Sequence, residues 1–308
     1  MVKIDLITGF LGSGKTTFIQ NYAHYLNSIG ERICIIENDF GAINVDMMLL
    51  GNLQNDLCDV EMVIGGDIDC LHRRLKTKLI SMAMLGYKRI IMEPSGIFDV
   101  DEIMDLLYES PLDNWYELGN IISIVDASLN TELSKESNYL LASQIAKAGK
   151  IILSKSQNAT DKQIAHTIDH LNEVMEMFNC NRVFKDEVIT LPWSEYTNKE
   201  YEMIERAEYK RVDHIKLRVL YENQYKNLFF MNLMITPEKL EEAAHQIFLD
   251  PLCGNVIRIK GFIPFEGHYK EINATKNEFS YQESDIGQNV VIMIGENLNE
   301  EAIQGYLK

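Results

Sequence analysis

The chain has 308 residues, of which 46% are hydrophobic, so it is long enough to form two domains with buried cores. Its formal net charge of −17 argues against a nucleic-acid partner, because nucleic-acid binding usually requires a basic face. No stretch approaches the roughly 18 consecutive apolar residues that span a bilayer, and the first residues predict a core strand instead of a signal sequence, so we expect a cytoplasmic protein with no membrane partner.

The first predicted element is a strand–loop–helix unit. An apolar run over residues 2–7 predicts a buried strand, and apolar residues recur at helical spacing from residue 18 to residue 26. Between them, residues 9–16 read Gly-Phe-Leu-Gly-Ser-Gly-Lys-Thr, which satisfies the G-x-x-x-x-G-K-S/T spacing of a P-loop. A strand before the loop and a helix after it favour a nucleotide-binding loop over an ordinary glycine-rich turn.

The chemistry of a P-loop explains these residue types. Glycines allow consecutive backbone N–H groups to turn toward a phosphate chain, and the following helix adds the positive end of its dipole. Lys15 is expected to reach the terminal phosphates, and the Thr16 hydroxyl is a hard oxygen ligand suited to Mg²⁺. The residues expected to hold a nucleoside triphosphate here are Gly9, Gly12, Ser13, Gly14, Lys15 and Thr16.

Two later strands are predicted to end in carboxylates. The apolar run before Glu37 predicts a buried strand, and ligands of open α/β sheets bind at the C-terminal ends of strands. The polar segment 38–46 suits either a loop that responds to the γ-phosphate or an ordinary strand-to-helix connection. Residues 90–92 form another apolar run that ends at Glu93 before a Pro-Ser-Gly turn, which is typical of a Walker B carboxylate that holds Mg²⁺.

Strands and helices alternate up to about residue 191. Further strands are predicted over 120–126, 150–153 and 188–191, and helices over 71–85, 99–109, 132–148 and 160–178. This alternation indicates an α/β fold, a P-loop NTPase domain whose mostly parallel sheet is covered on both faces.

The composition changes after the last of these strands. From Trp193 to Arg211 the chain is acidic and aromatic, and the alternation of strands and helices stops. We therefore expect a nucleotide-binding domain over residues 1–195, an acidic linker over 196–212 and a smaller C-terminal α+β domain over 213–308. Strand candidates in that last domain are 214–220, 228–235, 256–264 and 290–294, and helix candidates are 237–249 and 299–307.

Several motifs, taken in order, resemble the CobW-type (CobW/HypB/UreG-like) branch of the P-loop GTPases, which act as metallochaperones. They are the P-loop, the block 37–41 with Asp46 after it, the turn 93–96, the segment 123–127 and the C-terminal segments 258–262 and 292–298. The resemblance implies a GTP-hydrolysing switch with a low basal rate. Such a switch delivers a metal, or helps load a metal-containing cofactor, into a client metalloprotein or corrinoid-type protein.

By motif position, the resemblance also implies roles for individual residues. Residues 39–46 would form a switch that triphosphate and Mg²⁺ hold and that hydrolysis releases. Lys15, Thr16 and Thr17 would bind phosphates and Mg²⁺. The side chains implied to act in catalysis, around the magnesium ion and the attacking water, are Lys15, Glu37, Asp46 and Glu93.

One departure from the family concerns the transported metal. Where the family carries a C-x-C-C motif, this chain has Asp67-Ile68-Asp69-Cys70. Two carboxylates with one thiol favour harder ions than three thiolates do and lower the affinity expected for zinc. Two alternatives follow: a Zn²⁺ or Co²⁺ site formed by Asp67, Asp69 and Cys70 with nearby His72, or carboxylates that only cap the following helix.

A second departure concerns the nucleotide base. The family reads guanine with N-K-x-D, and the corresponding stretch here is Ser154-Lys155-Ser156-Gln157. The Gln157 amide offers one acceptor and one donor group, whereas an aspartate accepts two hydrogen bonds from guanine. We expect Lys155 and Gln157 to contact the base with weakened guanine selectivity, so GTP is the expected nucleotide and ATP is the alternative.

The sequence gives less support to other functions and to a second metal site. A regulatory module that senses nucleotide, with little turnover and no metal transfer, is the main alternative function, although the retained P-loop and carboxylates favour slow hydrolysis. A small-molecule kinase would need an acceptor site that no motif identifies. His166 and His170 lie four residues apart, a spacing that can chelate metal, but they lie off the apolar stripe and predict a solvated helix face.

Overall fold

The structure is a computed structural model of the chain, and it describes residues 1–39, 50–64, 68–94, 100–216, 225–285 and 287–308. The residues described before 217 belong to one compact unit, and those from 225 onward belong to a second. None of the helices within these ranges is long and apolar enough to cross a membrane.

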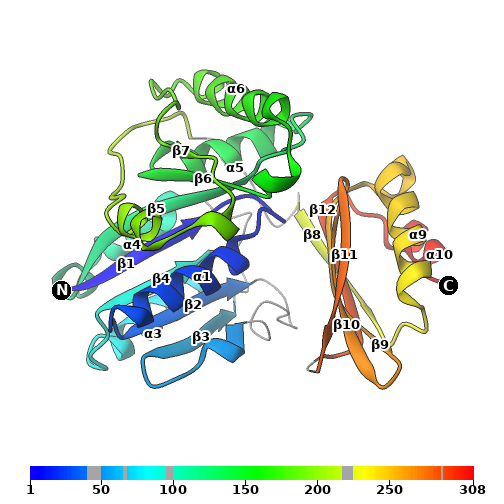
Figure 1. Cartoon of the computed structure of the whole chain (residues 1–308), viewed down its shortest axis with the longest axis horizontal. Coiled ribbons are helices and arrows are strands. Elements are labelled where there is room, and N and C mark those ends of the chain that lie inside the picture. Colours follow the sequence, from blue (N-terminus) through cyan, green and yellow to red (C-terminus); the bar gives the residue numbers. More distant parts are fainter. Residues whose placement is uncertain (40–49, 65–67, 95–99, 217–224, 286) are drawn as a thin grey trace. The chain divides into compact units, whose positions relative to one another are not determined.

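The first unit is built on one seven-stranded sheet in the order β3-β2-β4-β1-β5-β6-β7, and every neighbouring pair is parallel (Figure 1). The strands are β1 (Val2–Thr8), β2 (Ile33–Asp39), β3 (Cys58–Ile64), β4 (Arg89–Glu93), β5 (Tyr116–Asp126), β6 (Lys150–Ser154) and β7 (Val188–Ile189). The central strand β1 leads directly into the P-loop, so the predicted nucleotide loop starts from the middle of the sheet.

Helices cover both faces of this sheet. They are α1 (Lys15–Ser28), α3 (Ile68–Met82), α4 (Val100–Leu107), α5 (Lys135–Ala146), α6 (Asp161–Met177) and α7 (Asn198–Glu205), with the short 3₁₀ helices η1 (Gly51–Leu53), η2 (Leu112–Asn114), η3 (Ser156–Asn158) and η4 (Trp193–Glu195). Two separate apolar cores lie under them, one beneath α3, α4, α5 and α6 and the other beneath α1, η1 and α7.

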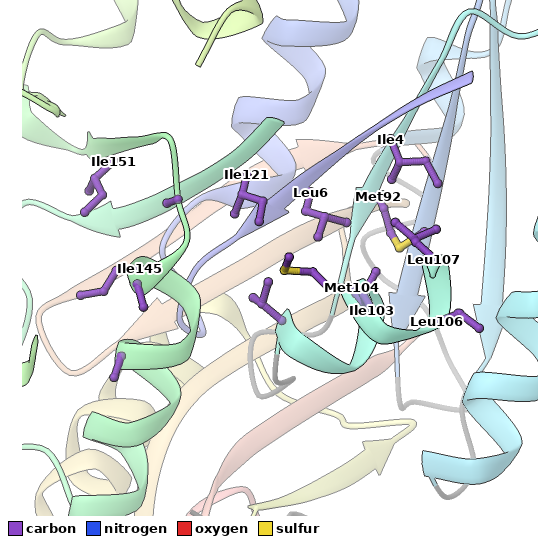
Figure 2. Close-up of a cluster of buried hydrophobic side chains, with 14 of the residues drawn as sticks. Ile4, Leu6, Met92, Ile103, Met104, Leu106, Leu107, Ile121, Ile145 and Ile151 are labelled. Atoms are coloured by element: carbon purple, nitrogen blue, oxygen red, sulfur yellow. The ribbon is translucent and has the colours of Figure 1, made fainter. Parts of the chain in front are cut away.

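Successive side chains of a strand point to opposite faces of the sheet, so each strand contributes to both cores. Ile4 and Leu6 of β1 join Met92 of β4 beneath helix α4 (Figure 2), whereas Ile7 and Ile91 pack under α1 on the opposite face. Because both sides of the central strands are buried, their sequences are mostly apolar, as is typical of parallel sheets, and the buried charges of Asp5 in β1 and Arg89 in β4 pair with each other. The prediction of a mostly parallel sheet covered on both faces is confirmed.

The second unit is an antiparallel sheet in the order β11-β10-β9-β12-β8, with two helices on one face (Figure 1). Its elements are β8 (Tyr225–Met231), α9 (Pro237–Leu249), η5 (Pro251–Cys253), β9 (Asn255–Phe265), β10 (His268–Thr275), β11 (Glu278–Ser284), β12 (Val290–Glu296) and α10 (Glu300–Tyr306). This is the predicted smaller α+β region. The hairpin β10–β11 was not predicted from the sequence, because β11 is mostly polar and exposed.

The segment 196–212, which its acidic composition assigned to a linker, packs on the first unit. Helix α7 lies against α1, where the rings of Tyr25 and Tyr201 stack with centroids 5.1 Å apart. Ile204 is fully buried in the core beneath α1, and the Glu205 carboxylate forms an ion pair with Arg89 of β4. The structure therefore continues the first unit past the predicted boundary, because a few apolar and paired side chains outweigh the exposed acids around them.

Candidate functional site

The loop after β1 has the backbone geometry of a phosphate cradle. Gly9 has φ +146°, and a Cβ at that position would lie 2.2 Å from the carbonyl oxygen of Ile124, so only glycine fits. Gly14 has φ +90° and immediately precedes α1, whose first N–H groups need an acceptor. A phosphate at this place would meet backbone N–H groups and the positive end of the helix dipole.

Two side chains of the loop are buried beside this cradle. Lys15 is 6% exposed, and its ammonium donates a hydrogen bond to the carbonyl oxygen of Gly9 at 3.0 Å. The hydroxyl of Ser13 is buried and has no hydrogen-bond partner among the residues that the structure describes. A buried polar atom left in this state usually signals a missing partner, and a phosphate oxygen would supply one.

Oxygen ligands converge next to the cradle. The Thr16 hydroxyl donates a hydrogen bond to Glu93 Oε1 at 3.3 Å, although the two residues are 77 positions apart. Glu37 is the register partner of Glu93 in the parallel pair β2–β4, and both carboxylates are at most 5% exposed. A hydroxyl with two carboxylates is the kind of hard donor set that suits Mg²⁺, so these residues fit the predicted metal.

Asn38, which follows Glu37, was not among the predicted site residues. It is 4% exposed, and neither amide atom has a hydrogen-bond partner within the described part of the chain. Its position at the C-terminal end of β2 was the available signal, because that end of a parallel strand faces ligands. Thr17, which was predicted to bind phosphate or Mg²⁺, lies exposed in the first turn of α1.

The loop after β6 lies on the other side of the cradle. Lys155 adopts the left-handed conformation with φ +56°, and its ammonium forms an ion pair with Asp126 Oδ2 at 2.9 Å. Ser156 is 7% exposed, and its hydroxyl lacks a hydrogen-bond partner among the described residues. Gln157 follows as an exposed residue of η3.

Trp193 belongs to this side of the site, although it was not among the predicted site residues. A Cβ added to Gly14 would lie 3.3 Å from the ring edge of Trp193 and 3.7 Å from the Cβ of Ser154. The indole also packs edge-to-face on Phe18, with ring centroids 5.9 Å apart. Its place just after the last parallel strand was a signal that could have found it.

Several predicted site residues lie outside the described residues. Asp46 and the rest of segment 40–46 belong to this group, as does Asp67. Helix α3 begins at Ile68, so the backbone of Asp69 and Cys70 lies in its first turn. Within the described ranges, no group of three His, Cys, Asp or Glu side chains could hold a metal ion.

The two histidines of α6 differ in their surroundings. His170 is 6% exposed, with Nε2 3.1 Å from Asn138 Oδ1, so the prediction of a solvated face was wrong for this residue. Burial under α5 lowers the pKa of His170 more than the nearby Glu173 carboxylate raises it. His166 is exposed, as predicted, and lies 3.2 Å from the Thr131 hydroxyl.

Comparison with known proteins identifies the family to which this site belongs. The model of the CobW/HypB/UreG nucleotide-binding domain matches residues 3–184, a range that runs from β1 past the end of α6. The chain belongs to the CobW/HypB/UreG family. This confirms the resemblance inferred from the P-loop and the carboxylate motifs.

Three relatives illustrate this membership. The zinc chaperone YeiR of Escherichia coli is 30% identical over 162 residues, covering 52% of this chain and 48% of the relative. The zinc chaperone YjiA of the same organism is 28% identical over 174 residues, covering 54% and 52%. The zinc-regulated GTPase metalloprotein activator 1 of Dictyostelium discoideum is 26% identical over 218 residues, covering 62% and 42%. The chain thus spans about half the length of these curated relatives.

Proposed function

We propose that this chain is a nucleotide-hydrolysing switch that acts as a metallochaperone or in the maturation and maintenance of a cofactor protein. The observation that carries the proposal is the convergence of Thr16, Glu93 and Glu37 beside the P-loop. Membership of the CobW/HypB/UreG family supports it, and so do the names of the relatives, which describe zinc chaperones and a GTPase that activates metalloproteins.

In the proposed hydrolysis, different groups of the site would bind the phosphates, hold Mg²⁺ and orient the attacking water. The loop N–H groups and Ser13 would hold the phosphate chain, and Lys15 would exchange its contact with Gly9 O for a terminal phosphate. Mg²⁺, held by Thr16 with Glu93 and Glu37, would neutralise charge that develops on the phosphate oxygens. One of these carboxylates, placed side by side by the β2–β4 register, would orient the attacking water.

The proposal that the chain delivers a metal ion rests on family membership and on the candidate metal ligands Asp67, Asp69 and Cys70. That set would favour cobalt or another ion harder than copper(I), and zinc would bind more weakly than to three thiolates. The client would accordingly be a metalloprotein or a corrinoid-type protein. Segment 39–46 is proposed as the switch that couples hydrolysis to this client.

Phosphate release from GTP and from ATP in Mg²⁺ tests the hydrolytic part. We expect slow turnover by the unmodified protein and by the control Lys162→Ala, which removes an exposed cation of α6. Lys15→Ala should lower turnover by at least about a hundredfold, because a charged contact to the transferred phosphate is lost. Equal turnover by the unmodified protein and Lys15→Ala would reject the hydrolytic switch.

Calorimetric titration of the nucleotide, with and without Zn²⁺ or Co²⁺, tests the metal part separately. Linkage is reciprocal: if a metal changes the affinity for nucleotide by some factor, nucleotide changes the affinity for that metal by the same factor. A change of affinity that Asp69→Asn abolishes would support direct metal handling. If neither metal binds and nucleotide affinity stays constant, metal delivery is wrong and a switch acting on a protein partner remains.

A further inference from the structure

We propose that the nucleotide site accepts adenine and guanine with similar affinity, because the loop after β6 presents the amide of Gln157, together with the Ser156 hydroxyl and the Trp193 ring, to the base. The inference rests on the proposed nucleotide-binding function. It specifies which class of nucleotide, a purine of either kind, this chain takes.

The order of the strands indicates where the base lies relative to the phosphates. Strands β2 and β4, which bring Glu37 and Glu93, lie on one side of β1, and β5 and β6 lie on the other (Figure 1). Metal and terminal phosphates belong on the carboxylate side, so the sugar and base extend toward β6. The Ser154 Cβ and the Trp193 ring, which flank Gly14, are the surfaces that the base meets there.

The loop after β6 has polar groups that are available to a ligand. The Ser154 hydroxyl donates a hydrogen bond to the Val125 carbonyl oxygen at 3.3 Å, and the ion pair with Asp126 holds Lys155. The buried Ser156 hydroxyl and the exposed Gln157 amide form no hydrogen bond within the described part of the chain. A buried unpartnered hydroxyl next to a free amide is a pair of groups that a ligand can satisfy.

The two purines differ in the hydrogen-bonding groups along one edge of the ring. Adenine presents a donor at N6 beside an acceptor at N1, whereas guanine presents an acceptor at O6 beside a donor at N1. An amide rotated by half a turn matches either edge, because it carries one donor group and one acceptor. A carboxylate at residue 157 would accept from guanine N1 and N2 and would repel adenine N1. Apolar contact with the Trp193 ring adds affinity without distinguishing the two bases.

The test is calorimetric titration with nucleoside diphosphates in Mg²⁺, which avoids turnover. For the unmodified protein, ADP and GDP should bind within about tenfold of each other, and CDP should bind far more weakly because its ring is smaller. Gln157→Asp should favour GDP over ADP by about a hundredfold, and IDP, which lacks the 2-amino group, should fall between them.

The matched control is Asn158→Asp, which adds the same charge one residue further along η3 and should leave the ADP to GDP ratio unchanged. A preference of the unmodified protein for GDP by a hundredfold would overturn the inference, and so would an unaltered ratio in Gln157→Asp. If no nucleotide binds at all, the proposed function itself fails, which is a distinct result from guanine selectivity.

Discussion

Arg89 is among the most deeply buried charged side chains described in the structure, with 1% of its surface exposed. Its guanidinium contacts Asp5 at 2.7 Å, Glu31 at 2.9 Å and Glu205 at 3.0 Å. Burial alone would lower the pKa of Arg89, but the carboxylates, above all Asp5, raise it. The cluster ties the first residue of β4 to the middle of β1 and to the last residue of helix α7.

Replacement of Arg89 by Met should destabilise the fold by about 3–5 kcal/mol, because the buried Asp5 carboxylate would lose its counter-charge. Urea denaturation measures this free energy of unfolding. The double variant Asp5→Asn/Arg89→Met should recover part of the loss, since the fully buried Asp5 charge is then removed together with its partner. A loss below about 1 kcal/mol in the single variant would mean that water or another cation compensates Asp5.

Glu93 is the residue at which the proposed magnesium site can be tested most directly. Glu93→Gln keeps the size of the side chain and an acceptor for the Thr16 hydroxyl but removes the negative charge. Turnover in Mg²⁺ should fall on the order of a hundredfold, whereas nucleotide affinity without Mg²⁺ should change little. Glu132→Gln, at an exposed position, is the control. Turnover unaffected by Glu93→Gln would remove this residue from the site.

At the level of elements, Asp101 connects helix α4 with two other segments. It forms ion pairs with Lys147, just after α5, and with Lys216 at 2.8 Å. Burial raises the pKa of Asp101, but hydrogen bonds from the two lysines outweigh it, so the pKa lies below its ordinary value. The ionised form is therefore favoured in the folded state more than in the unfolded chain.

Because of this lowered pKa, the contribution of Asp101 to the free energy of unfolding should depend on pH. A carboxyl group whose pKa is lower in the folded state stabilises the fold above the unfolded pKa and loses that contribution as pH falls through the folded pKa. Asp101→Asn should therefore reduce the free energy of unfolding near pH 7, and the difference from the unmodified protein should shrink as pH falls below about 4. Denaturation at a series of pH values measures it, and a difference independent of pH would contradict the assignment.

The sequence predicted those elements whose signal is local. The P-loop, the strand ending at Glu93 and the parallel sheet all depend on spacing within about ten residues. The contact between Thr16 and Glu93 depends on strand register, which spacing does not reveal. Helix α7 was taken for a linker because composition counts acids and does not indicate that Glu205 faces a buried arginine. Trp193 reaches Gly14 only through tertiary packing.

At the scale of the whole molecule, the apolar cores of the two units have no residue in common within the part of the chain that the structure describes. The cores of the first unit draw on residues up to Ile204, with Val212 packed against them, and that of the second begins at Phe230, with Leu228 packed against it. Each unit therefore has the buried apolar interior that an independently folding domain needs.

Calorimetry should accordingly resolve two unfolding transitions. Nucleotide at a hundredfold excess over its dissociation constant should stabilise the first unit by about 3 kcal/mol and leave the second transition in place. A fragment of residues 225–308 should reproduce the second transition alone. A single transition that shifts as a whole with nucleotide would mean that the two units unfold as one.

The packing of Trp193 against the P-loop gives the protein a built-in optical reporter. The chain has two tryptophans, and the other, Trp115, lies 37% exposed just after η2. Indole emission depends on the polarity around the ring, so a nucleotide arriving beside Gly14 should change the fluorescence of Trp193 without any attached label. With Trp115→Phe as the parent protein, rapid mixing would then follow association and release of each nucleotide in real time.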